Sequence, residues 1–283
     1  DEGCVVKESA ELRAANGGVL NLEGATVKRS ITVSSDSVFN LRAGRIVDAR
    51  VFVGTSGTIN MSGGAIVDNS YAGEYAVTIF QGTMNMSGGE IARNKGGAVY
   101  CLGTFTMTGG TINATQNYGI GVANRESNAV FDMSGDAKIN ASLFGVENGD
   151  TSGGLIDGGT ITMSGGQIIG QRAEGSKGVY SHDGTFTMTG GEISNFEKGV
   201  SINGTNFTMD KTGSDSSGTI SGNNTGVSVD GTFNMKAGKI QNNNGVGVYY
   251  SGGTFRMSGG SITGNGQYGL IRYALNKITP YIN

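Results

Sequence analysis

A short repeated sequence constrains this chain more than any other feature. The copy at residues 103–112 reads GTFTMTGGTI, and variants begin at residues 57, 82, 159, 184, 231 and 253. Within it, Phe105 and Met107 alternate with threonines, which is typical of a strand with one buried face. The Gly109-Gly110 pair then supplies the positive φ of a sharp corner. Repetition of this kind predicts a solenoid in which each copy is one structural unit.

Three apolar positions keep the same register in every copy. The position of Met107 recurs every 19 to 30 residues, and a second ladder lies two residues before it. A third ladder, at the position of Ile112, follows the glycine corner. No copy could bury its apolar face alone, so neighbouring copies must stack. The Met107 ladder runs through Leu22, Leu41, Met61, Met86, Met107, Met133, Met163, Met188, Met209, Met235 and Met257.

A further strand-like segment lies between copies, as at residues 177–180 and 246–250. Each copy therefore holds about three short strands. We predict an all-β fold: a single-stranded, right-handed parallel β-helix of about eleven rungs over residues 17–265. With about 4.8 Å per rung, the rod would be roughly 50 Å long. The single proline fits, because proline removes a donor from a paired strand.

The two ends depart from the repeat. We expect residues 1–16 to form an N-terminal cap, with a short helix over 8–15 that Ser9 could cap. An amphipathic helix leading into a glycine pair resembles the start of pectin-lyase-like β-helices. Residues 266–283 form a C-terminal cap or the start of a further segment. No signal peptide is recognisable at the start, which implies a removed signal or an excised fragment.

Cys4 and Cys101 are the two cysteines of the chain. Four rungs separate them, which is roughly 19 Å, whereas a disulfide needs Cα atoms within about 7 Å. We predict that they are not bonded to each other unless the N-terminal segment folds back along the rod, and that Cys101 is a buried free thiol. No spacing of Cys and His residues predicts a metal site, and we expect no cofactor.

The best candidates for catalysis are two carboxylates and an arginine. Asp48 and Asp68 occupy equivalent positions on neighbouring rungs, about 5 Å apart, and Arg93 has the same position on the next rung. Paired carboxylates can serve polysaccharide hydrolysis, and a charge ladder in solvent is the simpler interpretation. His182, the sole histidine, is expected at the surface. We predict a protein that is not an enzyme, with a polysaccharide lyase or hydrolase as the alternative.

Three segments interrupt the repeat, at residues 122–130, 141–159 and 209–220. Insertions in a solenoid emerge as surface loops, which often carry binding, although neutral variation at tolerant turns would give the same pattern. The candidate binding residues in and beside these loops are Arg125, Glu126, Glu147, Asp150, Lys211 and Asp215.

Charge is distributed unevenly. The chain has a net charge of −3, yet residues 231–283 carry five basic side chains and no acidic one. A positive end could bind a polyanion such as a sulfated glycan, or could be solvated charge without a ligand. The acidic total argues against nucleic acid. The five basic candidates are Lys236, Lys239, Arg256, Arg272 and Lys277.

The glycine corners carry a family resemblance. GGAI at residues 63–66, with GGEI, GGTI, GGQI and GGSI elsewhere, resembles the GGxI repeats of bacterial autotransporter passengers, including those of polymorphic outer-membrane proteins. The resemblance covers residues 17–265. It departs in lacking FxxN, whose place is taken by IxxN, as in Ile91–Asn94 and Ile262–Asn265.

The resemblance implies export by a separate outer-membrane translocator domain and an extracellular location, either displayed on the bacterial surface or secreted. It further implies an adhesin or virulence factor that binds a host cell-surface protein receptor or sulfated glycan. A soluble host-receptor ligand, such as an angiogenic factor, is a variant of this hypothesis. We expect a monomer. The outward threonine column that includes Thr104 leaves ice binding as a remote alternative.

Overall fold

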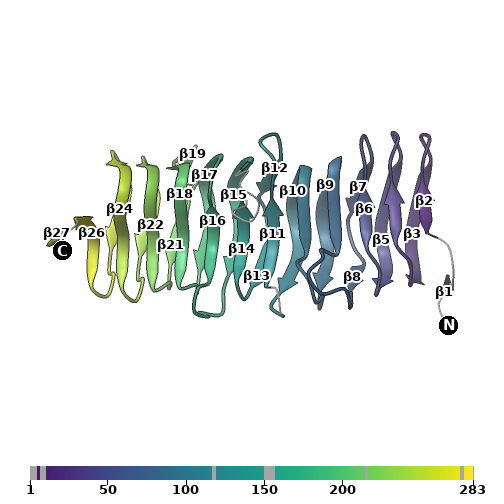
Figure 1. Cartoon of the computed structure of the whole chain (residues 1–283), viewed down its shortest axis with the longest axis horizontal. Coiled ribbons are helices and arrows are strands. Elements are labelled where there is room, and N and C mark those ends of the chain that lie inside the picture. Colours follow the sequence, from purple (N-terminus) through teal and green to yellow (C-terminus); the bar gives the residue numbers. More distant parts are fainter. Residues whose placement is uncertain are drawn as a thin grey trace.

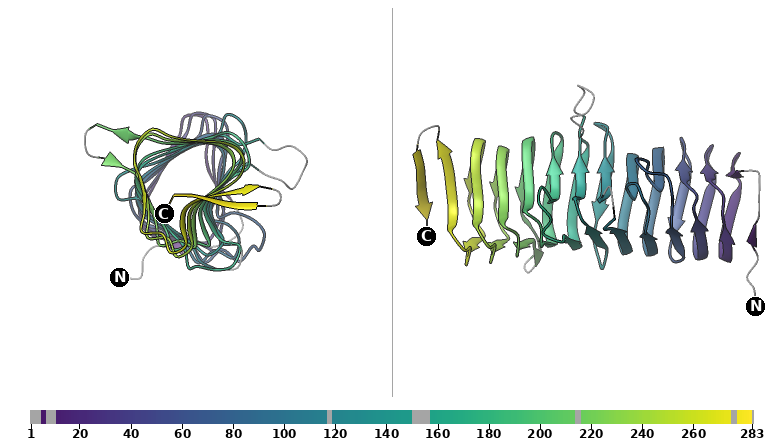
Figure 2. Two further views of the ribbon diagram at one scale, coloured as in Figure 1. Left: turned by 90° about the vertical axis from the view of Figure 1, so that its left-hand side faces the viewer. Right: turned by 60° about the horizontal axis from the view of Figure 1, so that its bottom comes forward.

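The computed structural model describes residues 5–6, 11–116, 119–149, 157–213, 216–274 and 277–282. It is a parallel β-solenoid of about 11 turns. Figure 1 shows the turns stacked side by side along one axis, and viewed along that axis they superpose on one closed outline (Figure 2, left). No described residue lies in a helix. The predicted all-β parallel solenoid is therefore confirmed, and its right-handedness stays a prediction.

Each turn has three faces, which we name after the residues of their inward ladders. The methionine face contains residues 104–107 and their equivalents, the isoleucine face residues 111–114, and the valine face residues 99–101. Long strands bend around the corners and belong to two or three faces. These long strands are β3 (Val19–Val27), β5 (Val38–Val47), β9 (Val77–Ala92), β10 (Val99–Ala114), β15 (Thr160–Ile169), β17 (Thr185–Ser194), β18 (Lys198–Met209), β22 (Thr225–Met235) and β24 (Val246–Met257).

The remaining strands are shorter and mostly belong to one face. On the methionine face they are β7 (Thr58–Met61) and β12 (Val130–Met133). On the isoleucine face they are β8 (Ala65–Val67), β13 (Lys138–Ala141), β21 (Thr219–Ser221), β23 (Lys239–Gln241) and β25 (Ser261–Thr263). On the valine face they are β2 (Leu12–Ala14), β4 (Ile31–Val33), β6 (Val51–Val53), β11 (Ile120–Asn124), β14 (Phe144–Asn148), β16 (Lys177–Ser181) and β26 (Tyr268–Ala274).

The three predicted ladders are all present in the register of the strands. Met107 pairs with Met86 on one side and Met133 on the other. In the middle turns the ladders are fully buried, with Met107 and Val99 each 0% exposed, whereas Met257 in the last turn of its ladder is 42% exposed. Phenylalanine rings stack along the core of the methionine face, where the centroid of Phe207 lies 4.6 Å from Phe186 and 4.7 Å from Phe233. Close packing of large rings through successive turns makes the interior one continuous apolar core.

The corner between the methionine and isoleucine faces needs its glycine. Gly110 has φ +79°, and a Cβ there would lie 2.8 Å from the carbonyl oxygen of Gly88 on the preceding turn. Both the left-handed backbone and the close stacking of turns exclude a side chain. The GG pair is therefore explained by the path of the chain.

A buried asparagine ladder closes the corner between the isoleucine and valine faces. The backbone N–H of Asn223 donates to Oδ1 of Asn243 at 3.1 Å, and the Asn223 side chain donates to the Ile193 carbonyl oxygen at 3.2 Å. Asn243 repeats the pattern with Asn265 and Ile220. The IxxN motif thus supplies hydrogen bonds to backbone groups that turn away from the sheets.

The expected N-terminal helix is wrong where the structure can be compared with it. Leu12–Ala14 forms β2, which pairs in parallel with β4. Leu12 and Ala14 alternate inward above Ile31 and Val33, so a strand here extends the core and satisfies the backbone edge of β4. Before it, β1 (Val5–Val6) pairs with β3. Ser9 lies outside the described residues.

Two short elements depart from the parallel stack. Strands β19 (Lys211–Thr212) and β20 (Ser216–Ser217) form an antiparallel hairpin in the predicted 209–220 loop. At the C-terminal end, β26 pairs antiparallel with β27 (Lys277–Ile282), which lies at one end of the rod in Figure 1. The last parallel turn is thereby followed by a hairpin.

Candidate binding surface

The proposed catalytic residues form a column at one corner. Asp48, Asp68 and Arg93 have φ of 52°, 61° and 55° at equivalent positions of three successive turns. Nε of Arg93 donates to Oδ1 of Asp68 at 2.7 Å, and Arg45 approaches Oδ2 at 3.6 Å. Oδ1 of Asp48 instead accepts a hydrogen bond from the backbone N–H of Ser70 at 2.9 Å. The structure thus aligns the three residues but couples only Asp68 and Arg93.

Both carboxyl groups are held in the ionised form. The hydrogen bond from Arg93 lowers the pKa of Asp68, and the hydrogen bonds from Ser70 lower the pKa of Asp48. A general acid for glycoside cleavage needs a raised pKa. Aspartate also tolerates the left-handed backbone of this corner, where Asn195 occupies the equivalent position. The column is accounted for by backbone conformation and ion pairing.

His182 is not at the surface, contrary to expectation. Its side chain is 6% exposed, and its ring centroid lies 3.9 Å from that of Tyr180. The ring centroids of Tyr180 and Phe144 are 5.2 Å apart, and Nζ of Lys177 lies 3.7 Å from the Tyr180 ring centre. Desolvation in this cluster lowers the pKa of Lys177 and raises that of Tyr180. Close packing against the tilted ring of Tyr180 helps to bury the histidine.

The candidates from the first two loops are more enclosed than expected. Arg125 and Glu147 form an ion pair of 2.6 Å with side chains 15% and 9% exposed. Glu147 lies on the outward side of β14, and Arg125 lies over the ring of Tyr100 at 6.0 Å. Glu126 is exposed. Asp150 and Asp215 lie outside the described residues.

The basic candidates do not form one patch. Lys236 pairs with Asp210 at 3.1 Å, and Lys211 is exposed in the hairpin. Lys239, Arg256 and Arg272 belong to strands of the isoleucine, methionine and valine faces. The side chain of Lys277 lies outside the description.

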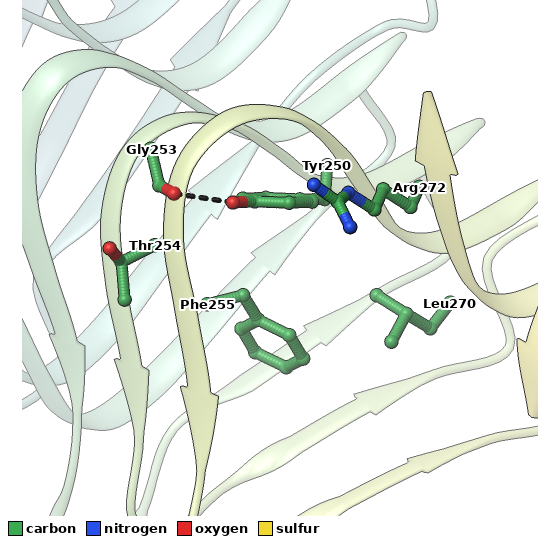
Figure 3. A pocket seen from close by; sticks show the side chains of 6 residues that line it. All are labelled: Tyr250, Gly253, Thr254, Phe255, Leu270 and Arg272. Carbon is green, nitrogen blue, oxygen red and sulfur yellow. Dashed lines mark hydrogen bonds between the residues drawn. The ribbon is translucent and has the colours of Figure 1, made fainter. Parts of the chain in front are cut away.

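A hollow of about 360 Å³ lies at the C-terminal end (Figure 3). Two inward residues line it: Phe255 from the methionine face and Leu270 from the valine face. Beside them the Tyr250 hydroxyl donates to the Gly253 carbonyl oxygen, and the Arg272 guanidinium lies 5.8 Å from the Tyr250 ring centre. The hollow is therefore the end of the core, where the stack of parallel turns stops.

The valine face carries a feature that sequence reasoning missed. Its outward column runs through Thr32, Phe52, Thr78 and Tyr100 on successive turns. Further outward aromatic rings on this face or on the segment leading into it are those of Tyr75, Phe80, Phe144, Tyr180, Tyr249 and Tyr273. At the outward positions of the other two faces, the described strands carry no aromatic residue.

This difference had a signal in the sequence. Phe52, Tyr100 and Tyr180 each follow the inward valine of their strand by one residue. The repeat pattern predicts these segments as strands, whose residues alternate between inward and outward positions. Separating the inward from the outward residues of each strand would have shown the aromatic column.

A groove of about 400 Å³ opens at the N-terminal end of this face. Phe52 is 39% exposed and Phe80 43% exposed, and their rings stack at 6.4 Å. Nε of Arg13 pairs with Glu11 at 2.7 Å, and Arg50 pairs with Glu74. The residues lining the groove are Glu11, Arg13, Ser30, Thr32, Arg50, Val51, Phe52 and Thr78.

The chain matches no protein-family model, no curated protein and no solved structure.

The described part of the chain holds no helix long and apolar enough to span a membrane. Among those same residues, no three His, Cys, Asp or Glu side chains lie together as a metal site would require.

Proposed function

We propose that the chain is an extracellular autotransporter passenger domain that binds a ligand on host cells through the valine face. The observation that carries the proposal is the restriction of outward aromatic rings to one of three otherwise similar faces. The GGxI corners support the passenger assignment by resemblance.

Exposed aromatic side chains indicate binding for a physical reason. Large rings lose little conformational entropy when they are covered and bury much area, so they dominate many binding surfaces. A soluble solenoid has no structural need for them at outward positions, because its core is already filled by the three inward ladders. Phe52 and Phe80 remain about two-fifths exposed. Covering them with a ligand would gain the apolar contact that the fold leaves open.

The proposed role is non-catalytic, with a polysaccharide lyase or hydrolase as the alternative. Asp48 and Asp68 have lowered pKa values and accept hydrogen bonds from Ser70 and Arg93. An enzyme working through them should cleave an acidic glycan and lose that activity in Asp68→Ala. Inactivity on a broad glycan panel would favour the binding role.

Binding to cultured mammalian cells tests the proposal. Labelled protein should bind saturably, and the double variant Tyr75→Ala/Tyr100→Ala on the valine face should bind at least tenfold more weakly. Thr106→Ala/Thr187→Ala on the methionine face is the matched control and should bind like the parent. Binding that survives heparinase would indicate a ligand other than heparan sulfate. Absence of saturable binding, or equal losses in both double variants, would contradict the proposal.

A further inference from the structure

We infer that the groove beside Phe52 binds an uncharged oligosaccharide, with the sugar chain lying along the rod. The inference rests on the proposed role of the valine face and names the chemical class of its ligand. Three properties of the groove support it: a flat aromatic shelf, a mixture of hydrogen-bond donors and acceptors, and a balanced charge.

The shelf is formed by two rings from successive turns. The rings of Phe52 and Phe80 are 20° from parallel, with centroids 6.4 Å apart, and both are substantially exposed. The two rings together leave neighbouring apolar areas exposed on this face. The C–H faces of a pyranose ring pack against aromatic faces of this kind, whereas the hydroxyl groups at the ring edge point sideways.

Polar side chains flank the shelf and can reach those hydroxyl groups. Arg13 and Arg50 are donors only, Glu11 is an acceptor, and the hydroxyls of Thr32 and Thr78 are both. All five line the groove. A sugar hydroxyl donates one hydrogen bond and accepts others, so it needs such a mixture. A purely apolar ligand would remove water from these groups without offering them new hydrogen bonds, which costs binding free energy.

The charges argue against a sulfated or carboxylated sugar. The two arginines of the groove, Arg13 and Arg50, are each paired with a glutamate, Glu11 and Glu74 respectively. Polyanions are bound through cations that are available to the anionic group. Here the ion pairs orient the guanidinium groups before any ligand arrives, which lowers the entropy cost of binding a neutral one.

The register of the strands sets the direction of the ligand. Arg13, Thr32, Phe52 and Thr78 form one column on four successive turns. Neighbouring turns are about 4.8 Å apart, which is comparable to the length of one sugar unit in an extended chain. An oligosaccharide parallel to the axis would therefore meet one side chain of the column per unit.

Calorimetric titration with cello-, xylo-, manno- and chito-oligosaccharides, and with heparin oligosaccharides as the charged comparison, tests the inference. At least one neutral series should bind, and Phe52→Ala and Arg50→Ala should each weaken it tenfold or more. The control Tyr273→Ala removes a ring that is 50% exposed on the same face but at the opposite end of the rod from the groove, and it should leave the affinity for the neutral sugars unchanged. Far-UV circular dichroism should be identical for all variants, because the replaced side chains lie outside the core.

The outcomes separate this inference from the proposed function. Cell binding that persists fully in Phe52→Ala/Phe80→Ala would overturn the neutral-sugar site and leave the valine-face proposal standing. Binding of heparin alone, or of no neutral series, would overturn the inference in the same way. Absence of cell binding together with neutral-sugar binding that depends on Phe52 would instead support the groove and contradict the host-cell role.

Discussion

The methionine and valine faces are built on the same parallel backbone, yet their outward surfaces differ in kind. On the methionine face, the side chain of Asn40 donates to Asn21 at 2.8 Å, Asn60 donates to Asn40 at 3.0 Å, and Asn85 donates to Asn60 at 3.0 Å. These side chains satisfy one another along the rod. On the valine face, Phe52 and Phe80 stack but stay substantially exposed.

Inward and outward positions of this solenoid are under different physical constraints. Inward positions are constrained on both faces, because every turn must pack on its neighbours. Outward positions are constrained only where side chains form ladders of their own. An outward residue that stacks but leaves large apolar area exposed is available to a ligand. The comparison predicts that substitutions on the two faces will separate stability from binding.

Phe207→Ala should have the largest effect on stability. Phe207 is fully buried between Phe186 and Phe233, so truncation should lower the free energy of unfolding by about 3–5 kcal/mol. Its outward neighbour Thr208 is the matched control, and Thr208→Ala should change stability by no more than about 0.5 kcal/mol. Urea unfolding followed by circular dichroism measures both. Similar losses in the two variants would contradict the assignment of inward and outward positions.

Cys101 tests the inward column of the valine face. Burial raises the pKa of this thiol from 9.0 to about 11. Between these values the unfolded chain releases a proton that the folded protein keeps, so unfolding free energy should fall as pH rises, by up to roughly 2–3 kcal/mol. Subtracting the pH profile of Cys101→Ala isolates this contribution from those of lysines and tyrosines. Parallel profiles would show that the thiol ionises equally in both states. Cys4 lies outside the described residues, so the predicted absence of a Cys4–Cys101 bond stays a prediction.

Asn243→Ala should remove hydrogen bonds to backbone groups at the corner between the isoleucine and valine faces. Asn243 accepts from the backbone N–H of Asn223 and donates to the Ile220 carbonyl oxygen. Leaving both groups buried and unpaired should cost about 1–3 kcal/mol. Thermal unfolding measures the loss, and exposed Asn244→Ala is the control in the next position. A loss no greater than that of the control would mean that water replaces the amide.

Asn60→Ala and Phe52→Ala compare the outward columns directly. Asn60 bonds to Asn40 and Asn85, so its loss should cost about 0.5–1.5 kcal/mol of stability without affecting binding. Phe52→Ala loses the stacking with Phe80 and should cost about 0.2–1 kcal/mol of stability, but it should weaken oligosaccharide binding at least tenfold. Urea titrations and calorimetry on the same preparations make the comparison. Weaker binding in Asn60→Ala together with unchanged binding in Phe52→Ala would contradict the assignment of ligand binding to the valine face.

Arg93→Ala should have the smallest effect. The Arg93–Asp68 pair is nearly half exposed, with side-chain exposures of 45% and 41%, and such pairs contribute about 0.2–1 kcal/mol. Because Arg93 lowers the pKa of Asp68, this contribution is present above the carboxyl's unfolded pKa and is lost as pH falls through the folded value. Unfolding in urea at low and high salt, and at neutral and acidic pH, measures it. A difference from the parent that is unaffected by salt or acid would exclude an ionic origin.

Much of the fold could be predicted because stacking repeats one local rule. The Met107, Phe105 and Ile112 ladders pair as expected, since each turn places the same inward positions on the same neighbours. The candidate site was predicted less well. Arg125 and Glu147 are enclosed by pairing with each other, and His182 is buried against Tyr180. The Arg125–Glu147 pair joins different turns, and the local sequence does not show which side chains will face one another across turns. Tyr180 and His182 lie two residues apart, and the path of the chain after β16 brings their rings together.

The solenoid, its three inward ladders and its glycine and asparagine corners could be predicted from the repeat alone, because those positions must recur whenever turns stack in parallel. Only tertiary contacts make Leu12–Ala14 a strand, because this segment pairs with the edge of β4 and packs on the core beneath it. The tertiary structure alone brought Phe52 to Phe80 and Arg50 to Glu74. Residues far apart in the chain become neighbours there only through the register of the turns.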